Sequence, residues 1–346
     1  MSKSVAPINT NASGEWTKYN RDEQFPKIAS LPVQFIKMDD GTRLAAYVTL
    51  PADSEGNAIT TPLPTVLIQT GYNGGFTGKA VSIFGGADPF LVKRGYATVV
   101  VDSVGTGQSS GAWSIFGPEE QAGYAAAVDW VTDQSFSNGR IGLFGFSYLG
   151  ITAMHTAAQQ HPAVKTAFIG VPIGDVYRDL AFTGGQVNVT FLPLFLSLVS
   201  TLGVTNPSVL TDPSSGIPTI LEHINGAVSN QIPLLLNGLA GDDEVVLDNN
   251  YWKVRSPSET VSKINIPTFL IGSLQDLFQR STPMLYEAIK QNTTAKLLIM
   301  PGQHFQASFG FGLPADNVPV FNEIALRWFD QYLKEMDVGA DTIPNV

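Results

Sequence analysis

The sequence contains no cysteine in its 346 residues. This absence excludes disulfides, zinc–thiolate sites, iron–sulfur clusters and a thiol nucleophile. Histidine is nearly as scarce, because only His155, His161, His223 and His304 occur, and no two of them have the spacing of a helical zinc motif. We therefore expect no metal site and no cofactor, so that any chemistry uses oxygen and nitrogen groups.

Charged residues are also few, at 14% of the sequence, and 30 acidic residues against 20 basic ones give a net charge of −10. Such a chain repels phosphate backbones and anionic lipid, so we expect a small-molecule substrate and no nucleic acid partner. The apolar run at residues 191–204 contains Pro193 and falls short of the roughly 20 residues that span a bilayer. We expect no membrane span.

Residues 1–32 are mostly polar and contain no apolar stretch of the length typical of a signal peptide. We expect them to form an N-terminal extension. Low charge, the absence of cysteine and many Ser, Thr, Asn and Gly residues slightly favour a secreted protein in its mature form over a cytoplasmic one.

Alternating strands and helices are predicted for most of the chain. Residues 33–50 have the pattern of two strands joined by Asp-Asp-Gly at 39–41, a strong hairpin signal. Short apolar runs that suit strands buried on both faces follow at 65–69, 97–101, 141–144, 167–171, 268–271 and 296–300. Helical patterns cover 118–132, 148–160 and 317–335. This order predicts a mostly parallel sheet with helices on both faces.

The interval from 172 to 266 has no clear strand and contains stretches rich in Leu and Ile. We interpret it as a helical cap inserted into an α/β-hydrolase domain made of residues 33–171 and 267–346. The alternative is a buried helix pair with no role in substrate binding, because apolar helical stripes usually belong to a core.

A serine stands between a predicted strand and a helix, in the run GFSYLG at 145–150. This arrangement is typical of the nucleophile elbow of α/β-hydrolases, in which a tight turn projects the serine hydroxyl at a helix N-terminus. The second glycine of the usual pattern is displaced by one position, to Gly150. We predict that Ser147 is the nucleophile.

A serine nucleophile needs a base, and the base needs a third group that holds its tautomer. In this fold both follow the serine in the chain, each after a late strand. His304 comes directly after the last predicted strand and is the predicted base, whereas His223 falls in the cap. Asp276 follows the penultimate strand and is the predicted acid, with Asp175, one strand earlier, as the alternative.

For three further titratable residues near these strands, we expect a structural role and no part in catalysis. His155 and His161 lie on or at the end of the helix after the elbow, where packing or helix capping is expected. Asp102 precedes the elbow and is expected to fix the loop 105–111 through backbone hydrogen bonds.

The tetrahedral intermediate of acyl transfer needs hydrogen-bond donors for its oxyanion. The backbone N–H of Tyr148, the residue after the nucleophile, is one predicted donor. The second donor should come from the loop 71–75, where the backbone N–H near Asn73 and the hydroxyl of Tyr72 are both candidates.

At this point the residues resemble the cocaine esterase and X-prolyl dipeptidyl peptidase family (CocE/NonD type) of serine hydrolases. The resemblance rests on the segments 39–48 (DDGTRLAAYV), 102–111 (DSVGTGQSSG), 129–150, which includes the elbow, and 251–257 (YWKVRSP). It extends from about residue 33 to residue 335. It implies that the hydroxyl of Tyr72 completes the oxyanion hole and that Ser147, Asp276 and His304 form the triad.

The sequence departs from the family pattern in two places. Val104 occupies the position of a usual arginine, which predicts that a structural ion pair is missing. Members commonly continue into a C-terminal jelly-roll domain, whereas this sequence ends at Val346, after its last predicted helix. The resemblance therefore implies the family's chemistry without its substrate selectivity.

These features make hydrolysis of a carboxylic ester through an acyl-enzyme the expected function. The main alternative is an X-prolyl dipeptidyl aminopeptidase, in which Asp175, Asp179 or the acidic cluster at 242–244 would hold a substrate ammonium group. An acyltransferase would use the same triad with a nucleophile other than water. The alternative outside the enzymes is a binding module without catalytic activity. Such a module is expected to lack a member of the triad, whereas all three residues are present.

Overall fold

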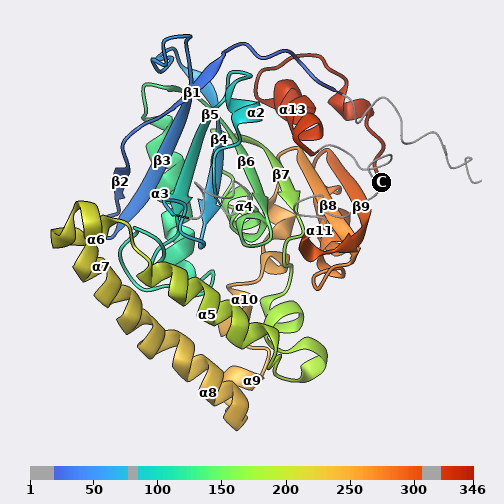
Figure 1. Cartoon of the computed structure of the whole chain (residues 1–346). Helices are drawn as coiled ribbons and strands as arrows, with labels where there is room; N and C mark the ends of the chain where they lie inside the picture. Colours follow the sequence, from blue (N-terminus) through green and yellow to red (C-terminus); the bar gives the residue numbers. More distant parts are fainter. Residues whose placement is uncertain (1–18, 77–84, 306–320) are drawn as a thin grey trace, which may run out of the picture.

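A nine-stranded sheet forms the centre of the computed structural model, which describes residues 19–76, 85–305 and 321–346 (Figure 1). The strand order is β1-β3-β5-β4-β6-β7-β8-β9, and β2 pairs with β3 off this path. The strands are β1 (Lys27–Ser30), β2 (Gln34–Lys37), β3 (Arg43–Ala52), β4 (Leu63–Thr70), β5 (Ala97–Asp102), β6 (Ser137–Phe146), β7 (Val164–Gly170), β8 (Thr268–Gln275) and β9 (Ala295–Gln303).

The sheet is mostly parallel, as predicted. Strands β5, β4, β6, β7, β8 and β9 pair in parallel, and each of the six predicted apolar runs contributes to one of them. The predicted hairpin is confirmed, because β2 and β3 pair antiparallel with Lys37 opposite Arg43. All positions of β5 are buried, which explains why its sequence is continuously apolar up to Asp102.

Strand β1 is not predicted by the sequence and lies within the expected N-terminal extension. It pairs antiparallel with the last part of β3, so that Lys27 lies opposite Ala52. Only its two central residues are partly buried. A short edge strand of this kind shows neither the alternation nor the apolar run by which strands are found.

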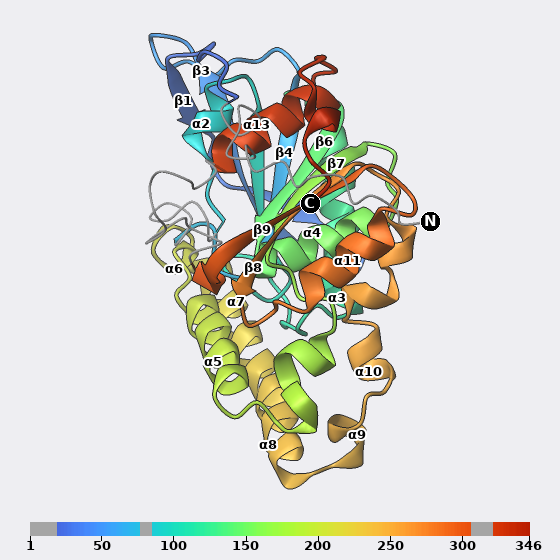
Figure 2. The same cartoon turned by 90° about the vertical axis from the view of Figure 1, so that its right-hand side faces the viewer.

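Helices cover both faces of the sheet (Figure 2). Val128, Met154 and Leu285 pack into the hydrophobic cluster on one face, and Leu91 and Phe329 pack into the cluster on the other. The helices concerned are α3 (Pro118–Thr132), α4 (Tyr148–Ala158) and α11 (Ser281–Ile289) on the first face, and α2 (Pro89–Val92) and α13 (Phe321–Tyr332) on the second.

The three predicted helices are found as α3, α4 and α13. The predicted range 118–132 agrees with α3 at both ends, and α4 ends two residues before the predicted end of 148–160. The predicted helix 317–335 corresponds to α13, which is described over Phe321–Tyr332 and ends three residues before the predicted end. Residues 317–320 lie outside the described residues.

Between β7 and β8 the chain forms a series of helices beyond one end of the sheet (Figures 1 and 2). We name residues 172–266 the cap. Helices α7, η5 and α8 follow one another without a break, so residues 213–240 form one long helix with a π-helical turn in its middle. The helical segments of the cap are η3 (Val176–Ala181), η4 (Thr183–Gly185), α5 (Phe191–Val204), α6 (Ser208–Thr211), α7 (Pro213–Gly226), η5 (Ala227–Gln231), α8 (Ile232–Ala240), α9 (Asp243–Val246), α10 (Asn250–Lys253), η6 (Pro257–Glu259) and η7 (Val261–Lys263).

One segment of the described chain, residues 191–211, is apolar and long enough to cross a membrane by length and composition alone. The core helices of many proteins meet the same criteria. Here the segment is divided between α5 and α6, and 33% of its most apolar part is buried. It therefore gives no clear sign of a membrane span.

Candidate active site

Ser147 lies in the sharp turn between β6 and α4. Its φ of 57° and ψ of −123° belong to a region that non-glycine residues rarely adopt. Gly145 makes this turn possible, because a Cβ there would lie 2.3 Å from the carbonyl carbon of Leu149. A Cβ at Gly150 would lie 2.9 Å from the carbonyl oxygen of Gly170, which explains why the second glycine stands at this position. The predicted nucleophile is thus one of the described residues whose backbone is strained.

The structure brings Ser147, His304 and Asp276 together at the carboxyl ends of β6, β9 and β8. The Nε2 atom of His304 lies 2.7 Å from the Oγ of Ser147, and its Nδ1 lies 3.0 and 3.1 Å from the two carboxylate oxygens of Asp276. Asp276 also accepts a hydrogen bond of 2.7 Å from the backbone N–H of Phe278, which fixes its orientation. His304 and Asp276 are both buried. The chain of contacts is that of a Ser-His-Asp triad.

The two alternative triad residues have other partners. Asp175 accepts a hydrogen bond of 2.7 Å from the guanidinium of Arg178 and a second from the backbone N–H of that residue. The ring nitrogens of His223 lie 2.8 Å from the carbonyl oxygen of Gly203 and 2.7 Å from that of Ser109. Both residues therefore bind within the cap or between the cap and a loop of the hydrolase domain.

The two histidines near α4 have structural partners. His155 is buried, and its Nε2 lies 3.1 Å from the carbonyl oxygen of Arg255. Burial lowers the pKa of His155 to about 4, so its ring is neutral near pH 7. His161 is partly exposed and pairs with Asp129 at 3.2 Å. The packing interpretation is thus confirmed for His155.

Tyr72 reaches Ser147 from the loop that follows β4. Its phenol forms a hydrogen bond with Ser147, and burial raises the pKa of Tyr72 to about 12, so the hydroxyl keeps its proton. The Asn73 side chain points elsewhere, because its Nδ2 donates to the carbonyl oxygens of Leu202 (3.0 Å) and Thr205 (2.7 Å) at the end of α5. Of the two predicted donors in this loop, the hydroxyl of Tyr72 therefore contacts the serine, and the backbone N–H near Asn73 stays a prediction.

Asp102 holds the Tyr72 loop from the other side. Its carboxylate accepts hydrogen bonds from the backbone N–H of Gly74 (2.6 Å), the backbone N–H of Gln108 (3.0 Å) and the hydroxyl of Tyr47 (2.7 Å). Burial raises the pKa of Asp102 to about 6. The structural interpretation of Asp102 is confirmed, and its contacts extend to the loop that carries Tyr72.

Glu120 connects the start of α3 to the nucleophile elbow, which the sequence does not predict. Its fully buried carboxylate accepts hydrogen bonds from the hydroxyls of Tyr148 (2.7 Å) and Tyr124 (3.0 Å) and from the backbone N–H groups of Ser114 (3.2 Å) and Phe116 (2.8 Å). Burial outweighs these four donors and raises the pKa of Glu120 to about 7. Two adjacent glutamates at a helix start look alike in sequence, so no signal separates Glu120 from Glu119.

We expect Glu120 to make stability depend on pH. Its pKa is raised from the ordinary 4.5 to about 7, so its contribution is complete below pH 4.5 and is lost as the pH rises to about 7. A shift of this size corresponds to roughly 3 kcal/mol. The side chain of Glu120→Gln is neutral at every pH. The free energy of unfolding of this variant minus that of the unmodified chain should therefore rise by roughly 3 kcal/mol between pH 4.5 and 7.

Urea denaturation of the two proteins at several pH values measures this difference. The matched control is Glu119→Gln, because Glu119 is exposed and its loss should leave the pH dependence unchanged. A difference curve that is flat, or that falls as the pH rises, would mean that the four donors keep Glu120 ionised.

Aromatic side chains of the cap and of the segment after β8 lie near the triad. The ring of Phe278 lies 5.2 Å from that of His304, and Phe191 of α5 packs edge-on against Phe278. Phe195, one turn further along α5, lies 6.3 Å from the ring of Tyr148. Aromatic rings therefore pack against His304 and Tyr148, which flank Ser147.

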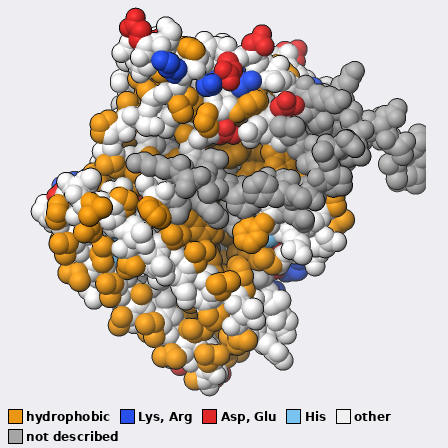
Figure 3. All heavy atoms as spheres, viewed as in Figure 1, with side chains coloured by type: hydrophobic (Ala, Val, Ile, Leu, Met, Phe, Trp, Pro, Cys, Tyr) orange, Lys and Arg blue, Asp and Glu red, His pale blue; other side chains and the backbone are white. Residues whose placement is uncertain are grey.

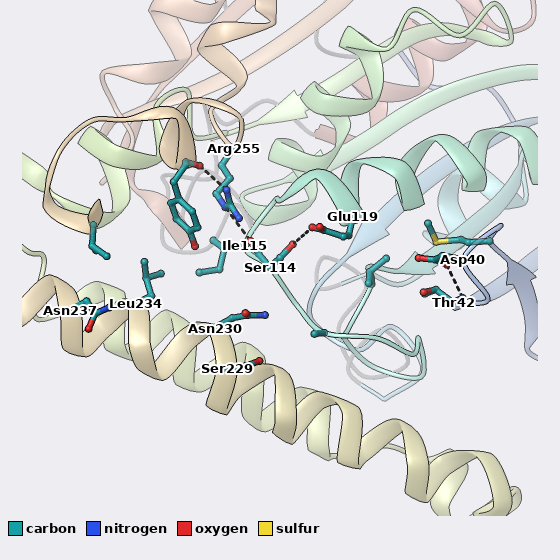
Figure 4. A pocket seen from close by; sticks show the side chains of 15 residues that line it. Asp40, Thr42, Ser114, Ile115, Glu119, Ser229, Asn230, Leu234, Asn237 and Arg255 are labelled. Atoms are coloured by element: carbon teal, nitrogen blue, oxygen red, sulfur yellow. Dashed lines mark hydrogen bonds between the residues drawn. The ribbon is translucent and has the colours of Figure 1, made fainter. Parts of the chain in front are cut away.

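A separate cavity of about 580 Å³ lies between the cap and the hydrolase domain (Figure 4). Ser114, Ile115, Leu234 and Arg255 are among its lining residues, and none of the three triad residues is. The neighbouring Trp113 donates from its ring N–H to the hydroxyl of Tyr148 at 2.9 Å. One loop thus separates this cavity from the elbow.

The sheet order, the elbow and the position of the triad define an α/β-hydrolase. A solved structure of a CocE/NonD family hydrolase from Staphylococcus aureus is similar to the chain with a TM-score of 0.68 and 22% sequence identity. The similarity covers 92% of this chain and 52% of that one. The predicted fold class is therefore confirmed.

The chain belongs to the X-Pro dipeptidyl-peptidase family (S15 family), whose model matches residues 40–306. The predicted family is thus confirmed. Cocaine esterase from Rhodococcus sp. (strain MB1 Bresler) is 26% identical over 332 residues, which cover 90% of this chain and 56% of that protein. An Xaa-Pro dipeptidyl-peptidase from Lacticaseibacillus casei (strain BL23) is 24% identical over 286 residues, covering 74% of this chain and 33% of that protein. The chain spans about half the length of the first relative and a third of the second.

Proposed function

We propose that the protein is a serine hydrolase that cleaves carboxylic esters through an acyl-enzyme. The observation that carries the proposal is the continuous chain of contacts from Ser147 through His304 to Asp276. A serine hydroxyl becomes a nucleophile when an adjacent imidazole takes its proton and a carboxylate stabilises the imidazolium that forms.

The proposed reaction uses these residues in turn. The Oγ of Ser147 attacks the ester carbonyl carbon while His304 takes the hydroxyl proton. The oxyanion accepts hydrogen bonds from the hydroxyl of Tyr72 and the backbone N–H of Tyr148. The tetrahedral intermediate then expels the alcohol, which receives its proton from His304. Water, deprotonated by the same histidine, hydrolyses the acyl-enzyme and restores Ser147.

Two observations favour esters over dipeptides with a free N-terminus. Two of the carboxylates suited to an ammonium group already have arginine partners, since Asp175 pairs with Arg178 and Asp179 pairs with Arg280 at 2.8 Å. The aromatic rings beside the triad suit an apolar acyl or aryl group. Aminopeptidase and acyltransferase activity remain the alternatives, because both use the same triad.

A substrate panel tests this proposal. Short-chain and long-chain p-nitrophenyl esters and Gly-Pro p-nitroanilide release the same type of chromophore and can be compared by kcat/KM. We expect an ester to exceed the anilide by at least about 10²-fold. A higher kcat/KM for the anilide would identify an aminopeptidase, and faster product formation with an added alcohol would identify an acyltransferase.

A further inference from the structure

The cavity between the cap and the hydrolase domain lies apart from the triad. Its volume of about 580 Å³ falls within the range of sites that bind small molecules. Ser114 and Ile115 line it, and Trp113 of the same loop contacts Tyr148 at the nucleophile elbow through the hydrogen bond of 2.9 Å. The cavity and the surroundings of Ser147 therefore lie on opposite sides of one loop.

Arg255 brings a positive charge to the wall of this cavity, although only 8% of the residue is exposed. Its guanidinium donates from Nε to the carbonyl oxygen of Ser114 at 3.2 Å and from Nη1 to that of Tyr251 at 2.7 Å. These two bonds use only part of the five N–H donors of a guanidinium. Within the part of the chain that the structure describes, Arg255 forms no ion pair with a carboxylate. A buried charge without a counter-charge is costly, so this position favours an anion.

The rest of the wall is largely apolar, with a few amide and hydroxyl groups. Ile115, Leu234 and Val245 provide apolar surface, and Asn230 and Asn237 add amides from η5 and α8. Figure 3 shows hydrophobic side chains gathered on the outer surface over α5, α7 and α8, whereas these two amides line the cavity. A ligand with an apolar body and one polar end fits such a lining.

The loop that forms one wall of the cavity has a strained backbone. Ile115 and Phe116 have φ angles of 54° and 60°, and a positive φ is an outlier for a β-branched residue such as isoleucine. The backbone N–H groups of Ser114 and Phe116 donate to the buried carboxylate of Glu120 at 3.2 and 2.8 Å, which holds the loop in this conformation. Strain of this kind is concentrated at binding and catalytic sites.

Two exposed carboxylates also line the cavity and restrict where an anion can bind. Asp40 accepts a hydrogen bond of 2.8 Å from the backbone N–H of Thr42, and Glu119 accepts one of 3.3 Å from the hydroxyl of Ser114. Figure 4 shows Asp40 and Arg255 on different sides of the cavity. Because water screens exposed charges strongly, an anion is stabilised at the buried Arg255 more than it is repelled by these carboxylates.

We propose that this cavity is a binding site for a small carboxylate with an apolar body, whose anionic group is held by Arg255. The carboxylate accepts hydrogen bonds from the remaining N–H groups of the guanidinium, whose planar donors match the geometry of a carboxylate. The apolar body lies against Ile115, Leu234 and Val245. The site is separate from the serine, so its ligand is bound and not cleaved.

Isothermal titration calorimetry with three naphthalene derivatives tests the charge of the ligand. We expect one 2-naphthoate to bind per chain, at least about 10-fold more tightly than neutral 2-naphthamide, because a charged acceptor forms stronger hydrogen bonds with a guanidinium. The cation 2-naphthylmethylammonium should bind more weakly than 2-naphthoate. Because calorimetry needs no turnover, the result is independent of the ester hydrolysis proposed above.

Two variants locate the bound carboxylate. Arg255→Gln should weaken the binding of 2-naphthoate by at least about 10-fold and change that of 2-naphthamide much less. Asn230→Trp should fill the cavity from an exposed position and weaken the binding of both compounds, and it keeps the guanidinium in place. The matched control is Asn225→Trp, at an exposed position of α7 that is not among the lining residues, and it should bind like the unmodified chain.

The thermal unfolding midpoint shows whether each variant is folded, and Asn230→Trp tests the site if Arg255→Gln does not fold. Equal affinity for 2-naphthoate and 2-naphthamide, or tighter binding of the ammonium compound, would overturn the proposal. Binding of 2-naphthoate that both variants retain would also overturn it, because the carboxylate would then occupy another site, such as the surroundings of Ser147.

Discussion

Ser147→Ala is expected to abolish ester hydrolysis, with a loss in kcat of roughly 10⁶-fold, because the acyl-enzyme cannot form without the hydroxyl. The fold should not change. Alanine keeps the Cβ at φ 57° and removes only the hydroxyl, so it adds no backbone strain to the turn. Hydrolysis of a p-nitrophenyl ester and the thermal unfolding midpoint, measured on the same sample, give both quantities.

The control for this variant is Ser262→Ala, which removes an exposed hydroxyl in η7 and should retain full activity. A p-nitrophenyl phosphonate provides a second readout, because Ser147 would attack phosphorus, release p-nitrophenol and remain covalently labelled. One label per chain, mapped to the peptide that contains Ser147, is expected. Retained turnover in Ser147→Ala, or labelling at another residue, would show that the nucleophile has been assigned incorrectly.

The sequence predicts the parts of the site whose position follows from the order of strands. Ser147, Asp276 and His304 each come three to five residues after the end of an apolar run. Once these runs form strands of one parallel sheet, their carboxyl ends share one edge of the sheet. The distances of 2.7 to 3.1 Å between these side chains result from the position of the strand ends at this edge, and not from the sequence next to each residue. Recognising short buried strands is therefore enough to place the three residues near one another.

Contacts that depend on packing between distant segments cannot be predicted in this way. Glu120 and Glu119 are equivalent in sequence, and only the fold puts the first against Tyr148. The Asn73 side chain binds the end of α5, a contact across more than one hundred residues that no spacing encodes. The apolar pattern of residues 213–240 identifies an amphipathic helix, but periodicity does not reveal which side faces the protein. Here the large apolar side faces outward.

Asp276→Asn is expected to lower kcat by roughly 10⁴-fold, the second largest effect. Asp276 accepts from the Nδ1 of His304 with both carboxylate oxygens, which leaves Nε2 free to take the proton of Ser147. An asparagine can also present an amide N–H to Nδ1. It then favours the tautomer in which Nε2 carries the hydrogen, and it provides no charge to stabilise the imidazolium. KM should change much less than kcat, because Asp276 contacts the histidine.

Asp175→Asn is the matched control, because Asp175 is the other acid that the sequence suggests. Its carboxylate pairs with Arg178 at 2.7 Å and caps the start of η3, so its loss should cost only a few tenths to about 1 kcal/mol of stability and leave kcat nearly unchanged. Both variants are compared with the unmodified chain by ester hydrolysis at a temperature well below the unfolding midpoint of each. A larger loss of kcat in Asp175→Asn than in Asp276→Asn would assign the acid to the earlier strand.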